Sequence, residues 1–544
     1  MKFRWCLILA LTWRVHAATP HWITPLGGGA HDGSSLANAW SPTDYASGGG
    51  VISGDDTVHL NLGIGGVSPF ASGFSLAFGG TSGHPVIYLF DAGCFFSAPN
   101  WNPSHGTTPV TAAYAALAVT AQYITLDGGT NGLITATSNG TGLATGLLEE
   151  GVYVSASNVT IQNLTITKMY LRTIGSDYFT GMRSIAGIYV INGSNILVNN
   201  CTISDSYDCV AMTFNNSSTY EIKGCMLTNA AVPISVGPAN TNETMSGVLL
   251  HNNFISIGTN WEGSPSIHRD CVHLFSTNTS TGTLTGGKIY DNIFTGDLQN
   301  NASDYVLVEG LVNTCLIYNN LFLQPGPLAQ GDGLLYCKGL GDNGTEILFN
   351  DFVTYNFNSV ILAPVTYGAT TLNGQVTIEN NIFEGSGAGS YIAIYDTDPS
   401  TTQVGTSDYN WFYGASGNTP KFRYKNASAI TLGGGAGWAS LGFDAHSNQS
   451  STATNVAPGL GLSYVPNAGA PVIGYATPLT STVPLDAAGN TRPTGTPPNG
   501  PAIGAFEHGG IMPTPTPTPT PTSPPNPPSP SASGLTLLPV PPGW

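Results

Sequence analysis

The stretch VLLHNNFI (248–255), a short apolar run that ends in an Asn pair, decides the fold because close copies of it recur along the chain. Between about residues 151 and 413 the copies return every few tens of residues, and no helical period competes with them. The other copies are NVTIQNLTI (158–166), NILVNNCTI (195–203), YEIKGCML (220–227), GKIYDNIF (287–294), CLIYNNLF (315–322), EILFNDFV (346–353) and QVTIENNIF (375–383). Such internal similarity predicts a repeat protein whose units pack on their neighbours.

Aligned on the Asn pair, the runs share one polar column. Its members are Asn163, Asn200, Gly224, Asn253, Asn292, Asn320, Asp351 and Asn381. An Asn residue tolerates the left-handed backbone of a tight turn, and its amide can bond the equivalent amide of the next unit. We therefore expect a ladder of stacked Asn side chains, with equivalent residues of neighbouring units lying one above another.

A second alternating segment lies between successive Asn runs. The copies are AGIYV (186–190), DCVAM (208–212), VPISV (232–236), DCVHL (270–274), DYVLV (304–308), DGLLY (332–336), NSVIL (358–362) and SYIAI (390–394). Their third and fifth positions are apolar in every copy, as a strand with one inward face requires. Two strand columns per unit predict an all-β fold, a parallel β-helix.

The composition agrees with one large β-rich body. The 544 residues include 69 Gly and 38 Pro with only 8% charged side chains, which excludes a coiled coil and a small disulfide-stapled module. The net charge of -17 disfavours nucleic acid and anionic lipid as partners, because phosphate binding needs clustered Lys and Arg.

The two ends of the chain indicate export. Residues 1–17 have the basic start, short apolar run and small-residue exit of a secretory signal peptide, so we expect a secreted protein, extracellular or on the cell surface. No later segment is apolar enough to predict a transmembrane segment. Residues 511–544 form a disordered Pro/Thr-rich stalk and tail, which could attach the protein to a surface.

The repeat resembles the right-handed parallel β-helix proteins of the pectate-lyase-like superfamily, and the Asn ladder is the most specific part of that resemblance. WITPLGGGAHDGSSLANAW (22–40) looks like the opening of many secreted β-helix proteins. PVIGYATPLTSTVPLDAAGNTRPTGTPPNGPAIGAFE (471–507) is similar to their closing segment, with matching residues at Asp486, Gly489, Arg492, Ile503, Gly504 and Glu507. Because a solenoid must cover its exposed core, we expect both segments to cap its ends.

The sequence thus predicts five regions. They are a signal peptide (1–17), an N-terminal cap with the first coils (18–110), the parallel β-helix (111–465), a C-terminal closing segment (466–510) and the stalk and tail (511–544). Seven cysteines follow the signal peptide. Cys201 and Cys225 each come directly after the ladder position in adjacent coils, about 4.8 Å apart, and are the best candidates for a disulfide.

The column that opens the second strand contains three acids in successive coils. It consists of Ala186, Asp208, Val232, Asp270, Asp304, Asp332, Asn358 and Ser390. Stacked about 4.8 Å apart, the carboxylates of Asp270, Asp304 and Asp332 would repel one another, which favours a raised pKa or a bound cation such as Ca²⁺. Alternatively, Asp is simply a good turn residue at the start of a strand.

The neighbours of this column supply candidates for the other roles in a site. Glu262 and Asp208 could bind substrate, and Trp261 could stack on a sugar ring. The candidate catalytic residues are Asp270, Asp304, Asp332, His268, Arg269, His273 and Lys338. Lyases of the superfamily use calcium and an Arg or Lys base, as the resemblance implies, but no lyase motif matches residue for residue.

One hydrolase motif can be tested directly. CTISDSYDCVAM (201–212) is similar to the paired-Asp motif of polygalacturonases, but Tyr207 and Ala186 stand where acids are expected, so only Asp208 survives. Two function classes stay open. The first is a secreted carbohydrate-active enzyme, a lyase or a glycosidase, that cleaves a polysaccharide in a groove beside residues 261–338. The alternative is a non-catalytic surface protein, an adhesin, glycan-binding protein or fibre subunit, presented on the Pro/Thr stalk.

Overall fold

The computed structural model describes most of the chain between residues 18 and 509. The described residues are 18–66, 68–103, 112–172, 185–214, 218–238, 243–258, 261, 269–276, 282–296, 298, 304–324, 326, 333–355, 358–367, 370–387, 391–415, 419–433, 435–447, 456–461, 463–479 and 481–509. The predicted signal peptide and the Pro/Thr-rich tail therefore lie outside the described residues.

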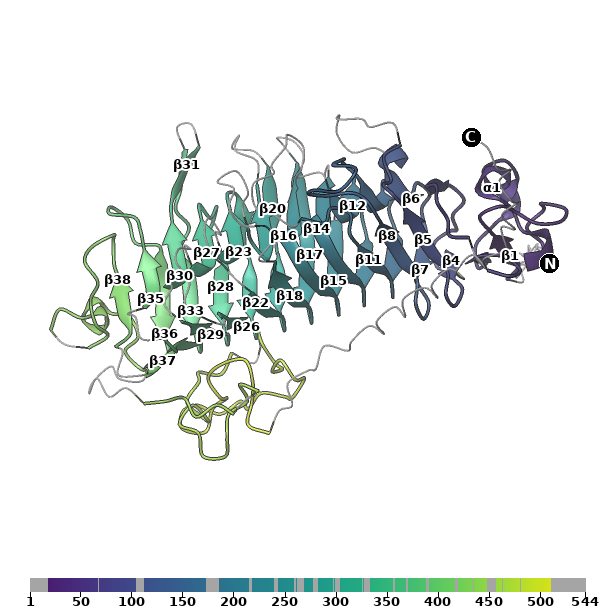
Figure 1. Cartoon of the computed structure of the whole chain (residues 1–544). Helices are drawn as coiled ribbons and strands as arrows, with labels where there is room; N and C mark the ends of the chain where they lie inside the picture. Colours follow the sequence, from purple (N-terminus) through teal and green to yellow (C-terminus); the bar gives the residue numbers. More distant parts are fainter. Residues whose placement is uncertain are drawn as a thin grey trace, which may run out of the picture.

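The described chain is a right-handed parallel β-helix, as predicted (Figure 1). Sheet A holds one short strand from nearly every coil. Its main path consists of β1 (Pro20–Ile23), β2 (Thr57–Leu60), β4 (Val86–Phe90), β7 (Ile124–Asp127), β10 (Val159–Gln162), β13 (Ile196–Asn199), β15 (Ser218–Lys223), β17 (Thr244–His251), β21 (Lys288–Tyr290), β25 (Leu316–Tyr318), β28 (Thr345–Leu348), β33 (Val376–Glu379) and β36 (Val404–Asp408). Two further strands, β20 (Thr283–Thr285) and β24 (Val312–Asn313), extend it beside β17.

Sheet B has two limbs that lie on two other sides of the coil. The strands of the first limb come directly after the turn that holds the Asn residues of the repeat. They are β5 (Phe95–Ala98), β8 (Leu133–Ala136), β11 (Thr165–Thr167), β18 (Phe254–Ile257), β22 (Ile293–Gly296), β26 (Leu321–Leu323), β29 (Asp351–Thr354), β34 (Ile382–Gly385) and β37 (Trp411–Gly414). The second limb consists of β3 (Phe74–Leu76), β6 (Ala115–Val119), β9 (Glu150–Val154), β12 (Ala186–Ile191), β19 (Val272–Phe275), β23 (Asp304–Glu309), β27 (Gly333–Lys338), β30 (Asn358–Ala363), β35 (Ile392–Asp396) and β38 (Lys421–Arg423). The long strands β14 (Thr202–Phe214) and β16 (Met226–Pro238) run through both limbs.

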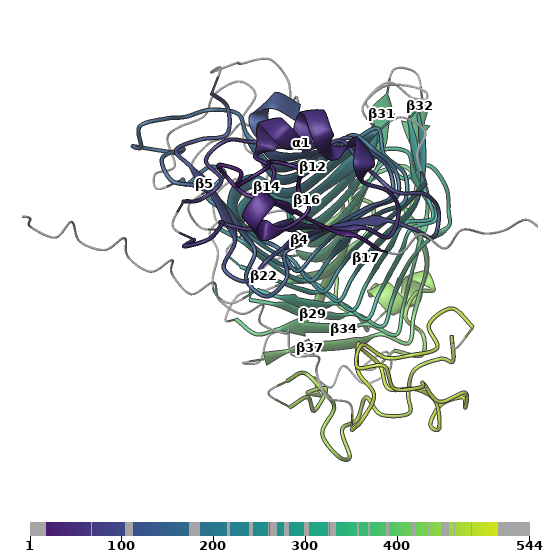
Figure 2. The same cartoon turned by 90° about the vertical axis from the view of Figure 1, so that its right-hand side faces the viewer.

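Parallel pairing keeps equivalent residues of successive coils in register. Along the second limb, for example, Tyr189 pairs with Ala211, Ala211 with Ser235 and Ser235 with His273. Figure 2, turned by 90° from Figure 1, shows the strands of successive coils running parallel to one another. A row read down the sequence alignment is therefore a row in space.

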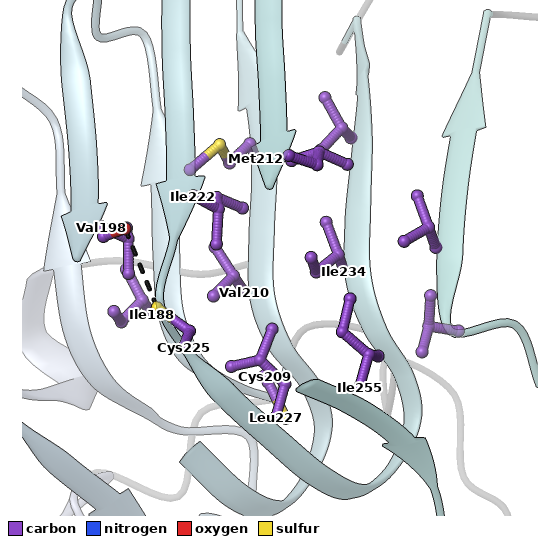
Figure 3. Close-up of a cluster of buried hydrophobic side chains, with 14 of the residues drawn as sticks. Ile188, Val198, Cys209, Val210, Met212, Ile222, Cys225, Leu227, Ile234 and Ile255 are labelled. Carbon is purple, nitrogen blue, oxygen red and sulfur yellow. Dashed lines mark hydrogen bonds between the residues drawn. The ribbon is translucent and has the colours of Figure 1, made fainter. Parts of the chain in front are cut away.

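Inward side chains fill the coil with a continuous apolar core. Figure 3 shows part of it, where Ile188, Val210 and Ile234 of the second limb meet Val198 and Ile222 of sheet A. Further along, stacked rings with centroids 4.6–5.1 Å apart run along the first limb, namely Phe294, Phe322, Phe352, Phe383 and Phe412. Burying such a row in every coil stabilises the solenoid along its length.

The Asn ladder exists, but its residues differ in part from the predicted column. Buried amides stack from coil to coil, each Oδ1 accepting bonds from the preceding Asn, at Asn253, Asn292, Asn320, Asn350, Asn381 and Asn410. Asn163, Asn200 and Gly224 lie in the neighbouring column of left-handed corner residues, with φ between 51° and 62°. The prediction of Asp351 as a ladder member is wrong. Phe349 takes the left-handed position there (φ 55°), so the ladder falls on Asn350.

The ladder position changes from thiol to amide along the chain. Cys225 N–H donates to Asn253 Oδ1 (3.0 Å), and Cys201 N–H lies 3.5 Å from Cys225 Sγ, so both cysteines occupy ladder positions. Each thiol points at a main-chain carbonyl of the preceding coil, as the dashed line from Cys225 to Val198 in Figure 3 marks. All seven described cysteines are free thiols, so the predicted disulfide between Cys201 and Cys225 is not formed.

The two ends of the solenoid are closed by different means. At the N-terminal end (Figure 1), the helix α1 (Pro42–Gly48) buries Tyr45 against Trp40 and Tyr88, beside the turns η1 (Leu36–Asn38) and η2 (Gly49–Val51). At the other end, the turn η7 (Trp438–Leu441) stacks Trp438 on Phe422 of the last coil.

The segment 456–509 does not cap the C-terminal end, so that part of the closing-segment interpretation is wrong. It packs on the flank of the solenoid, below β26 and β29 in Figure 1. Asn380 Nδ2 donates to Thr477 O (3.0 Å), and Ala505 N–H donates to Asp351 Oδ1 (3.2 Å). Arg492 bonds both Glu507 (2.7 Å) and Asn319 (2.8 Å). The segment docks there because its apolar residues cover Phe349, Ile382 and Trp411 at the corner between sheet A and the first limb.

Candidate active site

Three ionisable side chains form a cluster on the outer face of the second limb. His273 (β19), Glu309 (β23) and Lys338 (β27) come from three successive coils. The distance from His273 Nε2 to Glu309 Oε2 is 3.5 Å, and Lys338 Nζ lies 2.7 Å from Glu309 Oε1. Their side chains are 19%, 20% and 34% exposed, although the His273 Nε2 atom itself is buried, and we call these three residues the sheet B cluster.

The alternation of the strands places these side chains outward. In β23, for example, Val306 and Val308 point into the core, so Leu307 and Glu309 face out. The hydrogen bond to His273 and the Lys338 ammonium lower the pKa of Glu309 from 4.5 to about 2, although its partial burial opposes this. Glu309 is therefore a carboxylate at any ordinary pH and holds two cationic or proton-accepting groups beside it.

A second cluster of the same composition lies on the outer face of sheet A. Lys223 Nζ is 2.8 Å and His251 Nε2 is 2.9 Å from Glu221 Oε1. His251 stacks on Tyr290 (4.5 Å between centroids), and Tyr290 stacks on Tyr318 (4.9 Å). We call these three charged residues the sheet A cluster.

Asp270 and Asp304 lie at the start of their strands and are fully buried. Asp270 Oδ1 accepts a hydrogen bond from Asp304 N–H (3.1 Å), which is the role of a turn residue that ties two coils together. Asp332, the third predicted acid, lies outside the described residues, and the residue that pairs with Asp304 in the next coil is Gly333. Of the predicted row of three carboxylates, the described residues contain Asp270 and Asp304.

The other predicted residues lie mostly in the interior. Asp208 is 3% exposed and pairs with Ala186 and Val232 as expected. Arg269 is 1% exposed. Trp261 is 1% exposed, its indole N–H donates to Asn229 O (3.0 Å), and its ring packs against Tyr207. Trp261 therefore cannot stack on a bound sugar. Glu262 and His268 lie outside the described residues.

Sequence reasoning missed two acids. Glu309 is the centre of the sheet B cluster, and its signal was its place five residues after Asp304, where the next coil has Lys338. Glu150 lies in the column of Asp208, paired with Ala186. It is fully buried, and burial together with the nearby Glu149 carboxyl raises its pKa well above the usual value. Glu150 therefore belongs to the interior of the solenoid and not to its outer face.

The described residues do not fit the calcium centre that the superfamily resemblance implies. Among them there is no group of three His, Cys, Asp or Glu side chains that could hold a metal ion. Asp270 and Asp304 are only two, and one of them already binds a backbone N–H. We therefore derive no chemical step through a cation.

Within the described part of the chain, none of the helices is long and apolar enough to span a membrane. No protein-family model and no curated protein matches the sequence. Among solved structures, pectate lyase Pel9A is similar at 15% identity, with a TM-score of 0.45, over 91% of this chain and 98% of that one.

Two further solved structures are similar in the same range. A lacto-N-biosidase from Eubacterium ramulus has 13% identity and a TM-score of 0.43, over 69% of this chain and 67% of that one. A PL6 family polysaccharide lyase from Pseudopedobacter saltans has 10% identity and a TM-score of 0.41, over 72% and 86%. At these identities the likeness concerns the fold alone. The predicted parallel β-helix is confirmed by the strand register described above.

Proposed function

We propose that the protein is a secreted polysaccharide lyase that binds an acidic chain across the outer face of the second limb. One observation carries the proposal: a histidine, a carboxylate and a lysine meet on the solvent side of three successive strands, in a chain with only 8% charged residues. These are the groups that removal of a proton next to a sugar carboxylate requires. Secretion rests on the signal-like residues 1–17.

In the proposed reaction His273 is the base. Its imidazole accepts the proton on C5 of a uronate residue, the electron pair of that bond forms the C4=C5 double bond, and the C4–O bond to the next sugar breaks. The imidazolium then returns its proton to the departing oxygen, so no other reactant is consumed. Glu309 orients the imidazole and stabilises its charged form, as a carboxylate beside a catalytic histidine does.

Lys338 neutralises the substrate. An ammonium group has three N–H donors, and Glu309 takes one of them at 2.7 Å, so others can bond a uronate carboxylate. Pairing that carboxylate lowers the cost of the negative charge that develops when the neighbouring proton leaves.

The geometry favours elimination over hydrolysis. A glycosidase needs two reachable carboxyl groups, one acid and one base or nucleophile, on either side of the bond. Of the acids described on the second limb, Glu150, Asp208, Asp270, Asp304 and Asp396 are buried, and only Glu309 is partly exposed. With a pKa of about 2, Glu309 is also unsuited to donate a proton.

The test is a panel of uronate polymers, read by absorbance at 235 nm for the new double bond and by reducing ends. The proposal expects both signals together, and their loss in His273→Ala. Reducing ends without absorbance would contradict it and indicate a hydrolase. The matched control is His251→Ala, which removes the histidine of the sheet A cluster and should leave the signals unchanged.

The second candidate is a glycan-binding surface protein without catalysis. One observation favours it: each of the two carboxylate oxygens of Glu309 already has a partner, Lys338 or His273. A purely structural ion pair has the same arrangement. Retention on an immobilised glycan, with neither signal on any acidic or neutral polymer, would support it.

A further inference from the structure

The outer face of the second limb changes character along the axis. Towards the N-terminus from the sheet B cluster, the outward residues in register are Ser235, Ala211, Tyr189, Tyr153, Ala118 and Ser75. Two residues further along their strands, a second outward row in register contains Gly237, Thr213 and Ile191. None of these residues carries a charge, whereas His273, Glu309 and Lys338 follow at once on the other side.

Two parallel rings stand in this uncharged strip. Tyr153 and Tyr189 are stacked with centroids 6.4 Å apart and planes 1° apart, and the Tyr189 hydroxyl bonds Thr213 Oγ1 (3.1 Å). Tyr153 covers one face of the Tyr189 ring. The next residues in register beyond Tyr189 are Ala211, which is buried, and Ser235, and both have short side chains. Both rings are only half-buried, so a sugar ring could stack there.

At its far end the strip leads into a cleft of about 460 Å³. Phe74, Ser75, Asn100 and Trp101 line it together with small residues of 71–73 and 112–115. Hydroxyl, amide and aromatic groups are what an uncharged sugar binds, and no ionisable side chain is among the lining residues. From Ser75 to His273 there are six strand spacings, about 29 Å, which is room for several sugar residues.

We infer that this strip, from the cleft through Tyr153 and Tyr189 to Ser235, is a binding track for uncharged sugars, so that the substrate is a heteropolysaccharide. One uronate residue lies at the sheet B cluster, and neutral sugars follow toward the N-terminal end. This inference rests on the proposed function for the position of the uronate. A chain charged at every residue would meet no cation among the described residues of the track, in a protein whose net charge is -17.

The substrate class is tested with two polymers. Deacylated gellan, in which glucuronate alternates with runs of neutral sugars, and polygalacturonate, in which every residue is charged, are compared by retardation in affinity gels. The His273→Ala protein is used, so that binding is measured without cleavage. The track predicts at least tenfold tighter binding of the mixed polymer, and equal or tighter binding of polygalacturonate would overturn it.

Variants locate the binding. Tyr189→Ala should weaken binding of the mixed polymer about tenfold, whereas Tyr189→Phe, which keeps the ring, should have little effect. Ser235→Trp should block the track while leaving the melting temperature unchanged. The control is Tyr290→Ala in the aromatic stack of sheet A, which should bind normally.

The two proposals fail in different ways. If the lyase proposal is wrong, no polymer gives absorbance at 235 nm, but the Tyr189 and Ser235 variants still lose binding. If the track is wrong, those variants bind as well as the parent protein, whatever the activity is.

Discussion

The two His–Glu–Lys clusters have the same composition but lie on different faces of the solenoid. In the sheet A cluster, Glu221 and Lys223 belong to one strand, and only His251 comes from the next coil. In the sheet B cluster the three residues come from three coils. The sheet A cluster therefore ties two neighbouring coils together, whereas the sheet B cluster spreads its groups along the axis, as an extended substrate requires.

Their surroundings differ more than their internal distances. The aromatic stack beside His251 ends at Tyr318, which packs against the C-terminal segment, so that face is partly covered. The face beside His273 continues into an uncharged strip and a cleft. Because both clusters hold the same three residue types at bonding distance, composition alone does not distinguish them. We propose that access to a surface able to hold the substrate makes the sheet B cluster the site.

The largest difference is expected for the two histidines. His273→Ala should lower the rate of unsaturated product formation by about 10²- to 10⁴-fold, because a general base contributes that much. His251→Ala should stay close to the parent. Steady-state rates at 235 nm for both variants check this, and equal losses in the two would abolish the distinction between the clusters.

The lysines should show a smaller difference of the same kind. Lys338→Met should reduce kcat/KM about tenfold or more, since a hydrogen bond to a charged carboxylate is lost. Lys223→Met should leave kcat/KM unchanged. A Lys338→Arg variant, which keeps the charge, should recover part of the loss. Unaltered kcat/KM in Lys338→Met would remove the substrate-neutralising role.

The two carboxylates should differ in their contribution to acid stability. The pKa of Glu309 falls from 4.5 to about 2 on folding, so its ionised form stabilises the native state above about pH 4.5. This contribution disappears as the pH falls from 4.5 toward 2, and we expect it to be on the order of 1 kcal/mol for a pair at the surface.

Urea unfolding of Glu309→Gln and Glu221→Gln across that pH range measures the effect. The pKa of Glu221 is also lowered, by Lys223 and His251 against the effect of burial, and Glu221 is the more exposed of the two. Glu309→Gln should therefore flatten the pH dependence more than Glu221→Gln does. The reverse order would show that the sheet A cluster is the tighter one.

The smallest effect is expected from calcium. Each Glu in the two clusters already has its own Lys and His, and the described acids do not form a three-ligand site. Melting temperatures in calcium and in EGTA should therefore agree. A clear rise in calcium would indicate a cation bound by the folded protein and would restore Asp270 and Asp304 as candidate ligands.

The sequence predicted the solenoid well because stacked coils must each repeat the same alternation of inward apolar and outward side chains. It failed where one residue shifts the register. EILFNDFV was aligned on its polar pair, but Phe349 takes the left-handed corner and moves the ladder to Asn350. DGLLY was aligned on its first residue, but Gly333 takes the position opposite Asp304. Local patterns cannot separate these registers, because the long-range pairing selects between them.

The site was predictable only in part for a related reason. His273 was predicted on the outward face of the strand after Asp270, and Lys338 was one of the few basic residues near the acidic column. Trp261 and Arg269 were candidates through proximity in sequence, and both are buried. Whether a side chain in a corner loop faces the core or the solvent depends on tertiary packing, which no period in the sequence records. Glu309 comes directly after the five aligned residues DYVLV (304–308), so the column pattern does not include it.

The C-terminal segment has a consequence for how the solenoid opens. In a simple stack each coil holds only its two neighbours, so coils can fray one at a time from either end. Here the segment 456–509 forms hydrogen bonds with Asn319, Asp351 and Asn380, which belong to three successive coils. Those coils must separate together or not at all. We therefore expect proteases to cleave the C-terminal half of the described β-helix more slowly than the N-terminal half, which has no such segment bound to it.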